Sequence, residues 1–354
     1  MALNPSGVMS IGGTTVGASI NLELGLSATA NSSIGQTNFR ELAKVPTGAI
    51  SLSDFYGKSK AIKLSITENT IQYVLSPAVV PGYVAGSTSV ELTIGANVYV
   101  YSDNVSAPGL LISGFVEGDR LSIINNGFIL GKGGKGGSAA YMAVAQNGGS
   151  ALSITCPTQT TIQNNLYIAG GGGGGSAGSA CAGGGGAGGG AGGDVDVSAG
   201  GVGGGPGQIG GKPQYEIAEG GAGGGRILPG VGGAGGIYTE NLYVSPQGGG
   251  AGGGAGSIYY DDPAYSQGGA GGSGNNPGQN SYDTNPYGNQ NLGRAGSGGG
   301  GWGAVGGSTI GITGFPPQPV VFYGGLGGKA IALNGNGIFV TITGLLSQIY
   351  GDIS

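Results

Sequence analysis

The chain has 354 residues, of which 89 are glycine and 16 are proline, and its formal net charge at pH 7 is −5. Charged residues make up 8% of the chain and hydrophobic residues 38%, whereas disordered chains are typically rich in charge and poor in apolar residues. This composition favours an ordered chain, and the lack of a Gly-X-Y register excludes collagen. Histidine is absent, so the residue most often used for general acid–base chemistry is missing and we expect no enzymatic activity.

Two further absences narrow the class of protein. Residues 1–35 contain no Lys or Arg, and no apolar run approaches the roughly 18 residues that a membrane span needs, so neither a signal peptide nor a transmembrane helix is expected. Cys156 and Cys181 form neither a metal-ligand spacing nor a disulfide framework, so we expect two free thiols. The sequence therefore predicts synthesis in a cytoplasm, with no metal and no cofactor.

Residues 1–60 differ in character from the rest of the chain and are expected to form an attachment module. Leucines alternate with polar or small residues from 22 to 26, as in a short strand. A short helix would then end before Pro46, and a second capped turn covers residues 51–57. A segment with so few large apolar groups would struggle to fold alone, so we expect a partner protein to complete its core. The residues expected to mediate attachment are Phe39, Leu42, Phe55 and Tyr56.

Residues 61–130 have the pattern of β-structure. Short apolar runs with mostly alternating patterning, such as those at 62–66 and 90–94, are separated by turns at 81–82 and 108–109. This density of strands and turns predicts a small β-sandwich or barrel.

An internal repeat begins near the end of this segment. The pattern I-x-N-N-x-(aromatic)-I-x-G occurs at residues 123–131 and again at 162–170, and each copy leads directly into a glycine-rich stretch. A weaker third copy lies at 331–343, within the C-terminal segment 329–354. We expect these segments to be strands that stack as rungs and frame the glycine-rich region.

Most of the glycines lie between residues 131 and 328, in short runs interrupted by Ala, Ser or Val. Each glycine costs roughly 0.5–1 kcal/mol more than alanine to order, and few side chains are present to offset this by burial. The backbone must therefore supply the stabilisation, with one donor and one acceptor per residue. Polyproline II helices leave these groups free to bond sideways, so a polyglycine II sandwich is the expected fold of this region. The whole chain is then mainly β and irregular.

The connectors between the predicted glycine helices are expected to alternate between the two ends of the sandwich. Residues 176–181 and 194–198 then fall at opposite ends, because 182–193 is interpreted as one helix. Tyrosines mixed with Asn, Ser and Gly match the chemistry of antibody binding loops, which favours recognition. The tyrosines of the preferred receptor-binding end are Tyr215, Tyr238, Tyr243, Tyr282 and Tyr287. The tyrosines of the rival segment 257–267 are Tyr259, Tyr260 and Tyr265.

Three other sequence features are weaker indications of a functional site. Residues 131–138 superficially resemble a phosphate-binding loop, but the spacing is wrong. The pair Asp261 and Asp262 is interpreted as solvated loop acids rather than a calcium site or a catalytic pair. Trp302 lies between two glycines and is expected to cover one face of the glycine sandwich.

Three stretches of the chain resemble a known group of proteins. Residues 39–59, which contain FREL and GAISLSDFYGKS, resemble the opening segment of many tail and fibre proteins of tailed bacteriophages. Residues 118–127 (GDRLSIINNG) and 327–335 (GGKAIALNG) are similar to the distal tail-fibre adhesins of T-even-like phages. This resemblance implies a virion location and a polyglycine II sandwich whose tip loops bind outer-membrane receptors of the host.

Charge refines the expected partners. Residues 138–323 contain three basic and eight acidic residues, so nucleic acid is not expected, and an outer-membrane protein or a neutral glycan fits better. Other tail or baseplate proteins would bind the N-terminal module; a homotrimer fits a baseplate, and a single copy fits a fibre tip.

Two alternative functions stay open. One alternative is an ice-binding or other surface-binding glycine-rich protein. Another is a glycan-cleaving tail spike, for which the scattered acidic residues offer no carboxylate pair.

Overall fold

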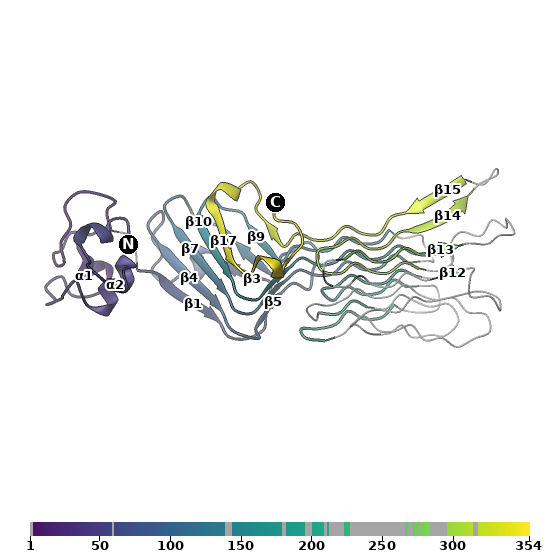
Figure 1. Ribbon diagram of the computed structural model, residues 1–354, viewed down its shortest axis with the longest axis horizontal. Helices are drawn as coiled ribbons and strands as arrows, with labels where there is room; N and C mark the ends of the chain where they lie inside the picture. Colours follow the sequence, from purple (N-terminus) through teal and green to yellow (C-terminus); the bar gives the residue numbers. More distant parts are fainter. Residues whose placement is uncertain are drawn as a thin grey trace.

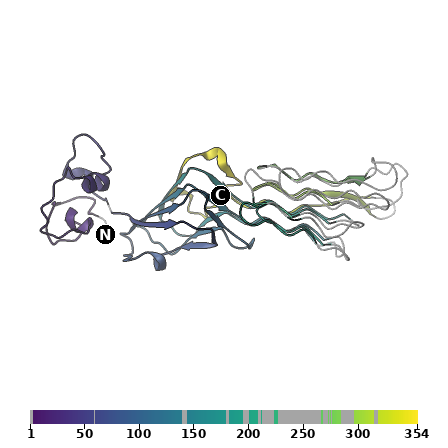
Figure 2. The ribbon, with the colours of Figure 1, turned by 90° about the horizontal axis from the view of Figure 1, so that it is seen from below.

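The protein is elongated in the computed structural model, with three parts along its length (Figure 1). An N-terminal module lies at one end, a β layer lies in the middle and a glycine-rich slab lies at the other end, as the perpendicular view also shows (Figure 2). The structure describes residues 3–58, 60–138, 144–178, 182–194, 200–208, 211, 223–226, 266–267, 272, 274, 276–283, 296–313 and 318–354.

The N-terminal module is a small helical unit. It contains α1 (Ile20–Glu23), α2 (Thr37–Ala43) and the 3-10 turn η1 (Leu52–Phe55). The predicted capped turn is confirmed, because Ser51 and Asp54 form a capping box at η1. The predicted strand at 22–26 is wrong. The side chain of Ser19 accepts a hydrogen bond from the Leu22 N–H and caps α1, which favours a helical turn over the strand.

The module has an apolar interior of its own. Phe39 and Phe55 are fully buried and pack edge to face, with 6.1 Å between their ring centroids, and Leu42 is buried beside them. The remaining members of this interior are Leu3, Met9, Ile20, Leu24 and Ala43. The expectation that a partner completes this core is therefore wrong, because the residues before α1 fold back over the helices and supply the missing apolar groups.

Three parallel sheets form the β layer. The first sheet contains β1 (Ile62–Ile66), β4 (Ser89–Ile94), β7 (Arg120–Asn125), β10 (Gln159–Asn164) and β17 (Val340–Gly344). The second contains β2 (Thr70–Ile71), β5 (Tyr99–Tyr101), β8 (Phe128–Leu130), β11 (Tyr167–Ala169) and β18 (Ile349–Tyr350), and the third contains β3 (Tyr73–Leu75), β6 (Leu110–Ile112), β9 (Leu152–Ile154) and β16 (Ile331–Ala332). Short 3-10 turns lie at η2 (Pro77–Val79), η3 (Gly337–Phe339) and η4 (Leu346–Gln348).

The chain visits the three sheets in turn and then begins the next coil, so the layer is a three-sided parallel β-helix. Each strand lies beside its equivalents in neighbouring coils, as β4 pairs with both β1 and β7. Along β4, Val90, Leu92 and Ile94 are buried inside the coil, whereas the residues between them are half-exposed. The predicted sandwich or barrel over 61–130 is not what forms. Alternating short strands are equally typical of a sandwich, a barrel and a parallel β-helix. The sequence of 61–130 also does not show that the last coils are formed by β16, β17 and β18, far along the chain.

The first two copies of the internal repeat lie at equivalent positions in adjacent coils, which confirms the prediction of stacked rungs for them. The third copy at 331–343 does not, because it spans β16, η3 and β17 at the corner between the third and first sheets. Asn125 lies beside Asn164, and Phe128 lies beside Tyr167. Both asparagines are fully buried at the corner between the first two sheets, where the Asn125 amide donates to Asn164 Oδ1 at 2.8 Å. The Asn164 amide in turn donates to the carbonyl of Leu345 in the last coil at 3.0 Å. The I-x-N-N motif therefore encodes a hydrogen-bonded ladder at a corner of the coil.

Both glycine-rich excursions leave the β layer at one corner, between the second and third sheets. In the first coil this corner is the single residue Gln72, which has a left-handed φ of 50°. In the second coil it spans 102–109, in the third 131–151 and in the fourth 170–330. The slab is thus an insertion into the same corner of successive coils.

Segment 171–176 shows how the slab is bonded. Its N–H groups donate to three neighbouring segments in rotation, at 2.8–3.0 Å, and each neighbour recurs after three residues. The donor–acceptor pairs are Gly171 with Gly149, Gly174 with Gln146, Gly172 with Ala187, Gly175 with Gly184, Gly173 with Ala304, and Ser176 with Gly307. Its carbonyls accept from three other segments with the same period, from the N–H groups of Gly328, Gly325, Gly134, Gly137, Gly300 and Ser297. Every backbone donor and acceptor of this segment is therefore satisfied by six neighbours.

This bonding requires glycine. A Cβ added at any residue from Gly170 to Gly175 would overlap a backbone carbonyl oxygen of an adjacent segment. The obstacle is main chain rather than a flexible side chain, so neighbouring segments would have to move apart. That movement would lengthen the lateral hydrogen bonds on which the slab depends.

A substitution at the centre of the slab tests this requirement. We expect Gly173→Ala to lower the free energy of unfolding by about 3 kcal/mol or more, because the new methyl group overpacks a site closed by backbone. Gly337→Ala is the matched control, since its Cβ would only touch the Leu333 side chain at an ordinary 3.4 Å. Urea denaturation of both variants measures the difference, and equal losses of stability would contradict the close-packed lattice.

Candidate functional site

The end of the slab far from the β layer, here called the distal end, gathers segments from separate parts of the sequence (Figure 1). The Gly183 N–H donates to the carbonyl of Gly137, and the Gly193 N–H donates to the carbonyl of Gly183, both at 2.9 Å. Lys135 forms an ion pair with Asp194, whose N–H donates to Ser138 Oγ at 3.2 Å. The described ends of these neighbouring segments therefore lie at the same level.

Within the described residues, the chain reverses inside a segment that was predicted to be one helix. Segment 182–193 is not one helix, because the chain turns at residues 187–189, beside the β layer, where Gly188 and Gly189 have positive φ values of 101° and 79°. The described residues that flank 179–181 and 195–199 consequently lie at the same end of the slab, not at opposite ends. Glycine adopts left-handed conformations as readily as right-handed ones, so a reversal inside a glycine run leaves no mark in the sequence.

Of the tyrosines expected at the binding end, only the backbone of Tyr282 lies among the described residues. It belongs to β13 (Tyr282–Asp283), which pairs antiparallel with β12 (Ser266–Gln267). The last residues of the rival segment 257–267 therefore pair, at the distal end, with a strand that contains one tyrosine of the preferred set. The remaining tyrosines lie outside the described residues: Tyr215, Tyr238, Tyr243, Tyr259, Tyr260, Tyr265 and Tyr287.

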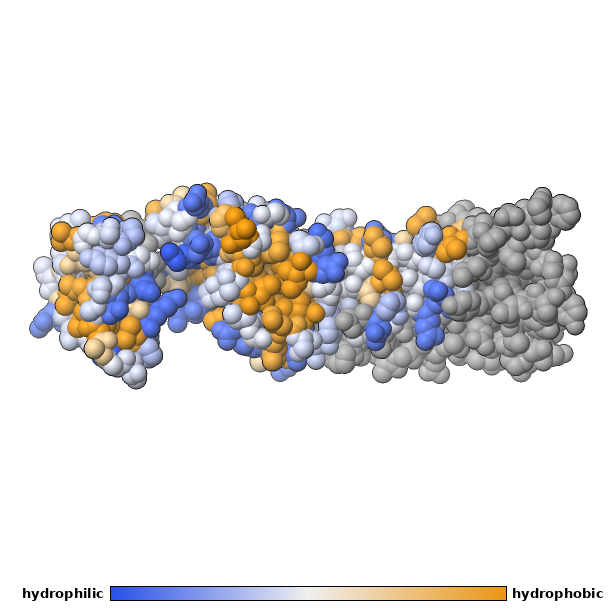
Figure 3. Space-filling view, turned by 45° about the horizontal axis from the view of Figure 1, so that its top comes forward, coloured by the Kyte–Doolittle hydropathy of each residue, from blue (hydrophilic) through white to orange (hydrophobic). Residues whose placement is uncertain are grey.

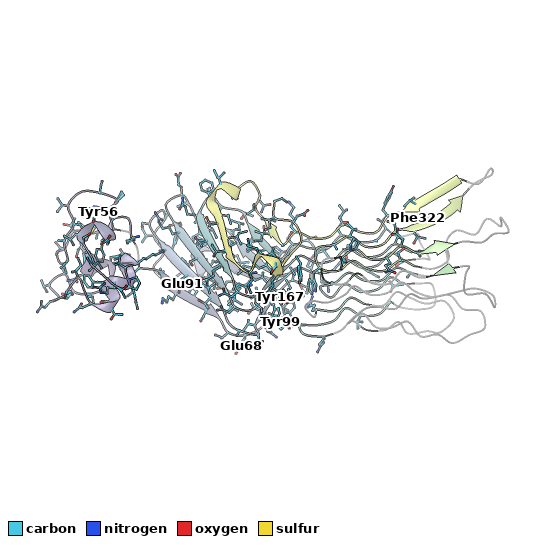
Figure 4. The ribbon with its side chains drawn as sticks, in the orientation of Figure 1. Tyr56, Glu68, Glu91, Tyr99, Tyr167 and Phe322 are labelled. Atoms are coloured by element: carbon cyan, nitrogen blue, oxygen red, sulfur yellow. The ribbon has the colours of Figure 1, made fainter. Side chains whose placement is uncertain are left out.

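An exposed pair near the distal end was missed from the sequence. Tyr323 is 74% exposed and Val144 is 87% exposed. They lie on adjacent segments, since the Gly148 N–H donates to the carbonyl of Leu326 and the Leu326 N–H donates to Asn147 Oδ1, both at 2.8 Å. Tyr323 directly follows β15 (Gln318–Phe322), which pairs with β14 (Thr309–Thr313), and Figure 4 labels the neighbouring Phe322 there. The available signal was a bulky aromatic residue directly before a glycine run.

On the face seen in Figure 3, the described part of the slab is mostly of intermediate or polar hydropathy with isolated apolar patches, whereas a larger apolar area covers the β layer. Within the described ranges, no three His, Cys, Asp or Glu residues come together as a metal site would require. Cys156 is a buried free thiol, and Cys181 lies outside the described residues. None of the described helices is long and apolar enough to cross a membrane.

The near end of the slab is fastened to the β layer by large side chains. Trp302 is fully buried against Leu130, Ala169 and Ala187, so it lies at this junction rather than on a face of the slab. Next to it a row of aromatic rings crosses the second sheet, and its members Tyr99 and Tyr167 are labelled in Figure 4. The ring centroids of successive members are 4.3 Å apart for Tyr99 and Phe128, 6.0 Å for Phe128 and Tyr167, and 5.8 Å for Tyr167 and Tyr350.

A buried cation completes the junction. The Arg226 guanidinium lies 4.5 Å from the centroid of the Tyr101 ring and donates to the carbonyls of Gly188 at 2.9 Å and Ser102 at 2.8 Å. Lys132 is half-buried and lies close enough to Arg226 for the two positive charges to repel each other. Burial and the neighbouring Arg226 guanidinium lower the pKa of Lys132 to about 8, against the opposing effect of Asp103. The tract 131–138, which superficially resembled a phosphate loop, is an outward-running segment of the slab.

Comparison with known proteins identifies the class. The family model of the phage tail fibre adhesin Gp38 matches residues 61–245, which is more than half of the chain. The protein is therefore a structural adhesin of a phage tail. Specifically, the chain belongs to the Gp38 family of phage tail fibre adhesins, which confirms the resemblance found in the sequence.

One solved structure is also similar. It is the crystal structure of the gp37-gp38 adhesin tip complex of the bacteriophage S16 long tail fibre, with 19% sequence identity and a TM-score of 0.40. The alignment covers 98% of this chain and 100% of that chain. No curated protein matches the sequence.

The perturbed lysine at the junction yields a pH-dependent prediction. The unfolded chain holds the Lys132 proton more tightly than the folded chain between the folded pKa of about 8 and the ordinary value of 10.5, so stability rises with pH across this window. At pH 7 we expect Lys132→Met to stabilise the protein by about 1 kcal/mol, since solvent screening reduces the effect at a half-buried group. Denaturation between pH 7 and 10.5 measures the gain.

The gain should shrink as the pH rises and vanish near pH 10.5. Lys63→Met is the matched control, because the Lys63 side chain is exposed and lies 3.9 Å from Glu91 in a weak surface pair. A gain from Lys132→Met that does not change with pH would show that methionine packing, rather than removal of a desolvated charge, is responsible.

Proposed function

We propose that this tail adhesin binds a receptor on the bacterial surface through the segments at the distal end of its slab. The observation that carries the proposal is the meeting of segments from distant parts of the sequence at the end of the molecule opposite the N-terminal module. Separate peptide segments held side by side on a rigid scaffold are the usual construction of a recognition surface. The tyrosine-rich composition of these segments supplies large contact area at low conformational cost.

The scaffold in this proposal is a polyglycine II sandwich that occupies residues 131–328. The three-residue rotation of hydrogen-bond partners along 171–176 supports it, because a polyproline II helix has three residues per turn and presents successive backbone groups in three directions. A pleated strand would instead bond in only two directions. The strands within 329–354 close the scaffold against the β layer.

Residues 1–60 attach the chain to the virion in this proposal. Because Phe39, Leu42 and Phe55 are buried in the module, they would act by holding it together, and the contact itself would come from exposed residues. The loop before α1 is the best candidate, since Val8 is 85% exposed and Val16 is 52% exposed. Tyr56 supports this loop, as its hydroxyl donates to the carbonyl of Gly7 at 2.6 Å.

The partner at the attachment end would be another tail, fibre or baseplate protein, in line with the gp37-gp38 complex of phage S16. At the distal end the acidic balance of residues 138–323 disfavours phosphate-rich targets and favours an outer-membrane protein or a neutral glycan. Tyr323 and Val144 extend the proposed receptor surface along one flank. A homotrimer suits attachment at a baseplate, and a single copy suits a fibre tip.

Segment exchange tests receptor binding. We expect replacement of 237–247 and 284–292 by Gly-Ser linkers of equal length to abolish adsorption of the phage to its host while virions still assemble. In a second arm, Tyr323→Ser should weaken adsorption about tenfold, as expected when one well-placed aromatic contact is removed. Ile338→Ser is the control, because Ile338 is just as exposed but lies on the β layer. Normal adsorption after replacement of both segments would rule out the distal end as the receptor-binding surface.

Attachment is tested separately. We expect Val8→Asp with Val16→Asp to yield virions that lack the adhesin, because two charges would be buried without partners at the tail contact. The purified variant should keep the thermal stability of the parent, since both side chains are exposed in the free chain. Asn31→Asp is the matched control, and immunoblotting of purified virions measures incorporation. Full incorporation of the double variant would place the contact elsewhere on the module.

A further inference from the structure

Four buried hydroxyl groups lie where the glycine segments give way to paired strands at the distal end. They belong to Ser176, Ser281, Ser297 and Thr309, and each residue is at most 2% exposed. Ser281 and Thr309 also form an isolated parallel bridge. Ser281 directly precedes β13 and Thr309 is the first residue of β14, so the cluster marks the last level of the glycine lattice.

The hydroxyls satisfy one another. Ser176 Oγ lies 2.8 Å from Thr309 Oγ1 and 3.3 Å from Ser297 Oγ, and Thr309 Oγ1 lies 2.9 Å from Ser297 Oγ. Ser281 Oγ lies 3.1 Å from Ser297 Oγ and 3.0 Å from Thr309 Oγ1. A consistent arrangement exists in which Ser176 donates to Thr309, Thr309 to Ser297, Ser297 to Ser281 and Ser281 to Thr309. Each O–H then has an acceptor inside the cluster.

The glycine lattice alone does not define how far each segment extends. Its hydrogen bonds repeat every three residues and involve only the backbone, so a segment that slides by three residues can form an equivalent set of bonds. Gly-rich strands are weakly specified in register for the same reason, since no side chains distinguish one alignment from another. A slip of three residues would shift the attached distal segment by about 9 Å, at roughly 3.1 Å per residue. Residues that are not glycine must therefore fix the alignment.

We infer that the hydroxyl cluster is a register lock that sets the height of the distal segments for receptor contact. It joins the stems of three connections: the stem before 177–181, both stems of 282–296 and the stem before 310–317. If the hairpin that contains Ser297 and Thr309 slid outward by three residues, Gly300 and Gly306 would take their places. The hydroxyls of Ser176 and Ser281 would then be buried without those partners, which is unfavourable. The inference rests on the proposed receptor function at this end.

The lock acts together with the junction beside the β layer. The same outward slide would withdraw Trp302 from its apolar site against Leu130 and Ala169. An inward slide by three residues would instead bring Arg294 and Ile312 to the positions of Ser297 and Thr309, and neither side chain matches a buried site shaped for a small hydroxyl. The two ends of the hairpin therefore restrict sliding in both directions.

Removal of hydroxyls without loss of shape tests the inference. We expect Thr309→Val with Ser297→Ala to raise the amide hydrogen-exchange rates of Ser176, Gly298 and Gly307 at least tenfold, while Gly170 and Gly303 at the near end stay protected. Adsorption to host cells should fall about tenfold. Thr309→Ser keeps a hydroxyl and should behave as the parent does. Thr341→Val is the matched control, because Thr341 is exposed on β17.

The outcomes separate the inference from the proposed function. Unchanged exchange at the distal amides would overturn the register lock. Faster exchange with normal adsorption would support the lock and overturn receptor binding at the distal end. If the double variant does not fold, Ser176→Ala provides the same readout, since Ser176 only donates within the arrangement above; rapid exchange confined to the distal amides supports the lock, and parental exchange overturns it.

Discussion

Lateral hydrogen bonding between backbones that lack a Cβ is the constraint on which the slab depends. In segment 171–176 every N–H and every carbonyl is bonded to one of six neighbours. A hydrogen bond contributes about 1 kcal/mol net, which is comparable to the additional entropy lost when glycine is ordered. A single segment therefore gains almost nothing by becoming extended on its own. The slab is stable only when all the neighbours of a segment are present, so something outside the slab has to bring them together.

The β layer performs this role at the near end. Its coils stack at a fixed spacing of roughly 4.8 Å, and the excursions at 131–151 and 170–330 leave from and return to one corner of it. Their first and last residues are thereby aligned before any lateral bond forms in the slab. Trp302 and Arg226 then fix two returning turns against this corner, through apolar burial in one case and hydrogen bonds to carbonyls in the other. A repetitive coil thus serves as the template for a lattice that has no side chains to guide it.

The sequence predicted the parts of the fold that a repeated side-chain pattern marks and missed several that depend on how distant segments come together. The stacked rungs at 123–131 and 162–170 could be predicted because Asn125 and Asn164 mark equivalent corners. The phage adhesin family could be identified from residues 118–127, which include the start of the first copy, and from residues 327–335. The parallel coil could not, because alternating short strands do not distinguish parallel from antiparallel pairing and the closing strands lie roughly 160 residues further along the chain. The reversal at 187–189 was invisible because it consists of residues that the flanking runs also contain. Tyr323 was missed because it lies outside the tyrosine-rich segments, and its exposure follows from its place beside a glycine segment rather than from the local sequence.

The slab and the segments attached to it tolerate sequence change to different degrees. Because the lattice recognises only the backbone, the composition of a distal connection has no effect on the packing beneath it, as long as the glycine run on each side is kept. The alignment of the runs is a different matter, since it depends on a few small side chains such as Ser297 and Thr309 and on the large ones at the junction. Under the proposed receptor function, the distal segments are free to vary, whereas the hydroxyl cluster directly below them is constrained by its burial and its hydrogen bonds. The boundary between variable and constrained sequence should accordingly fall within one or two residues of these four hydroxyls.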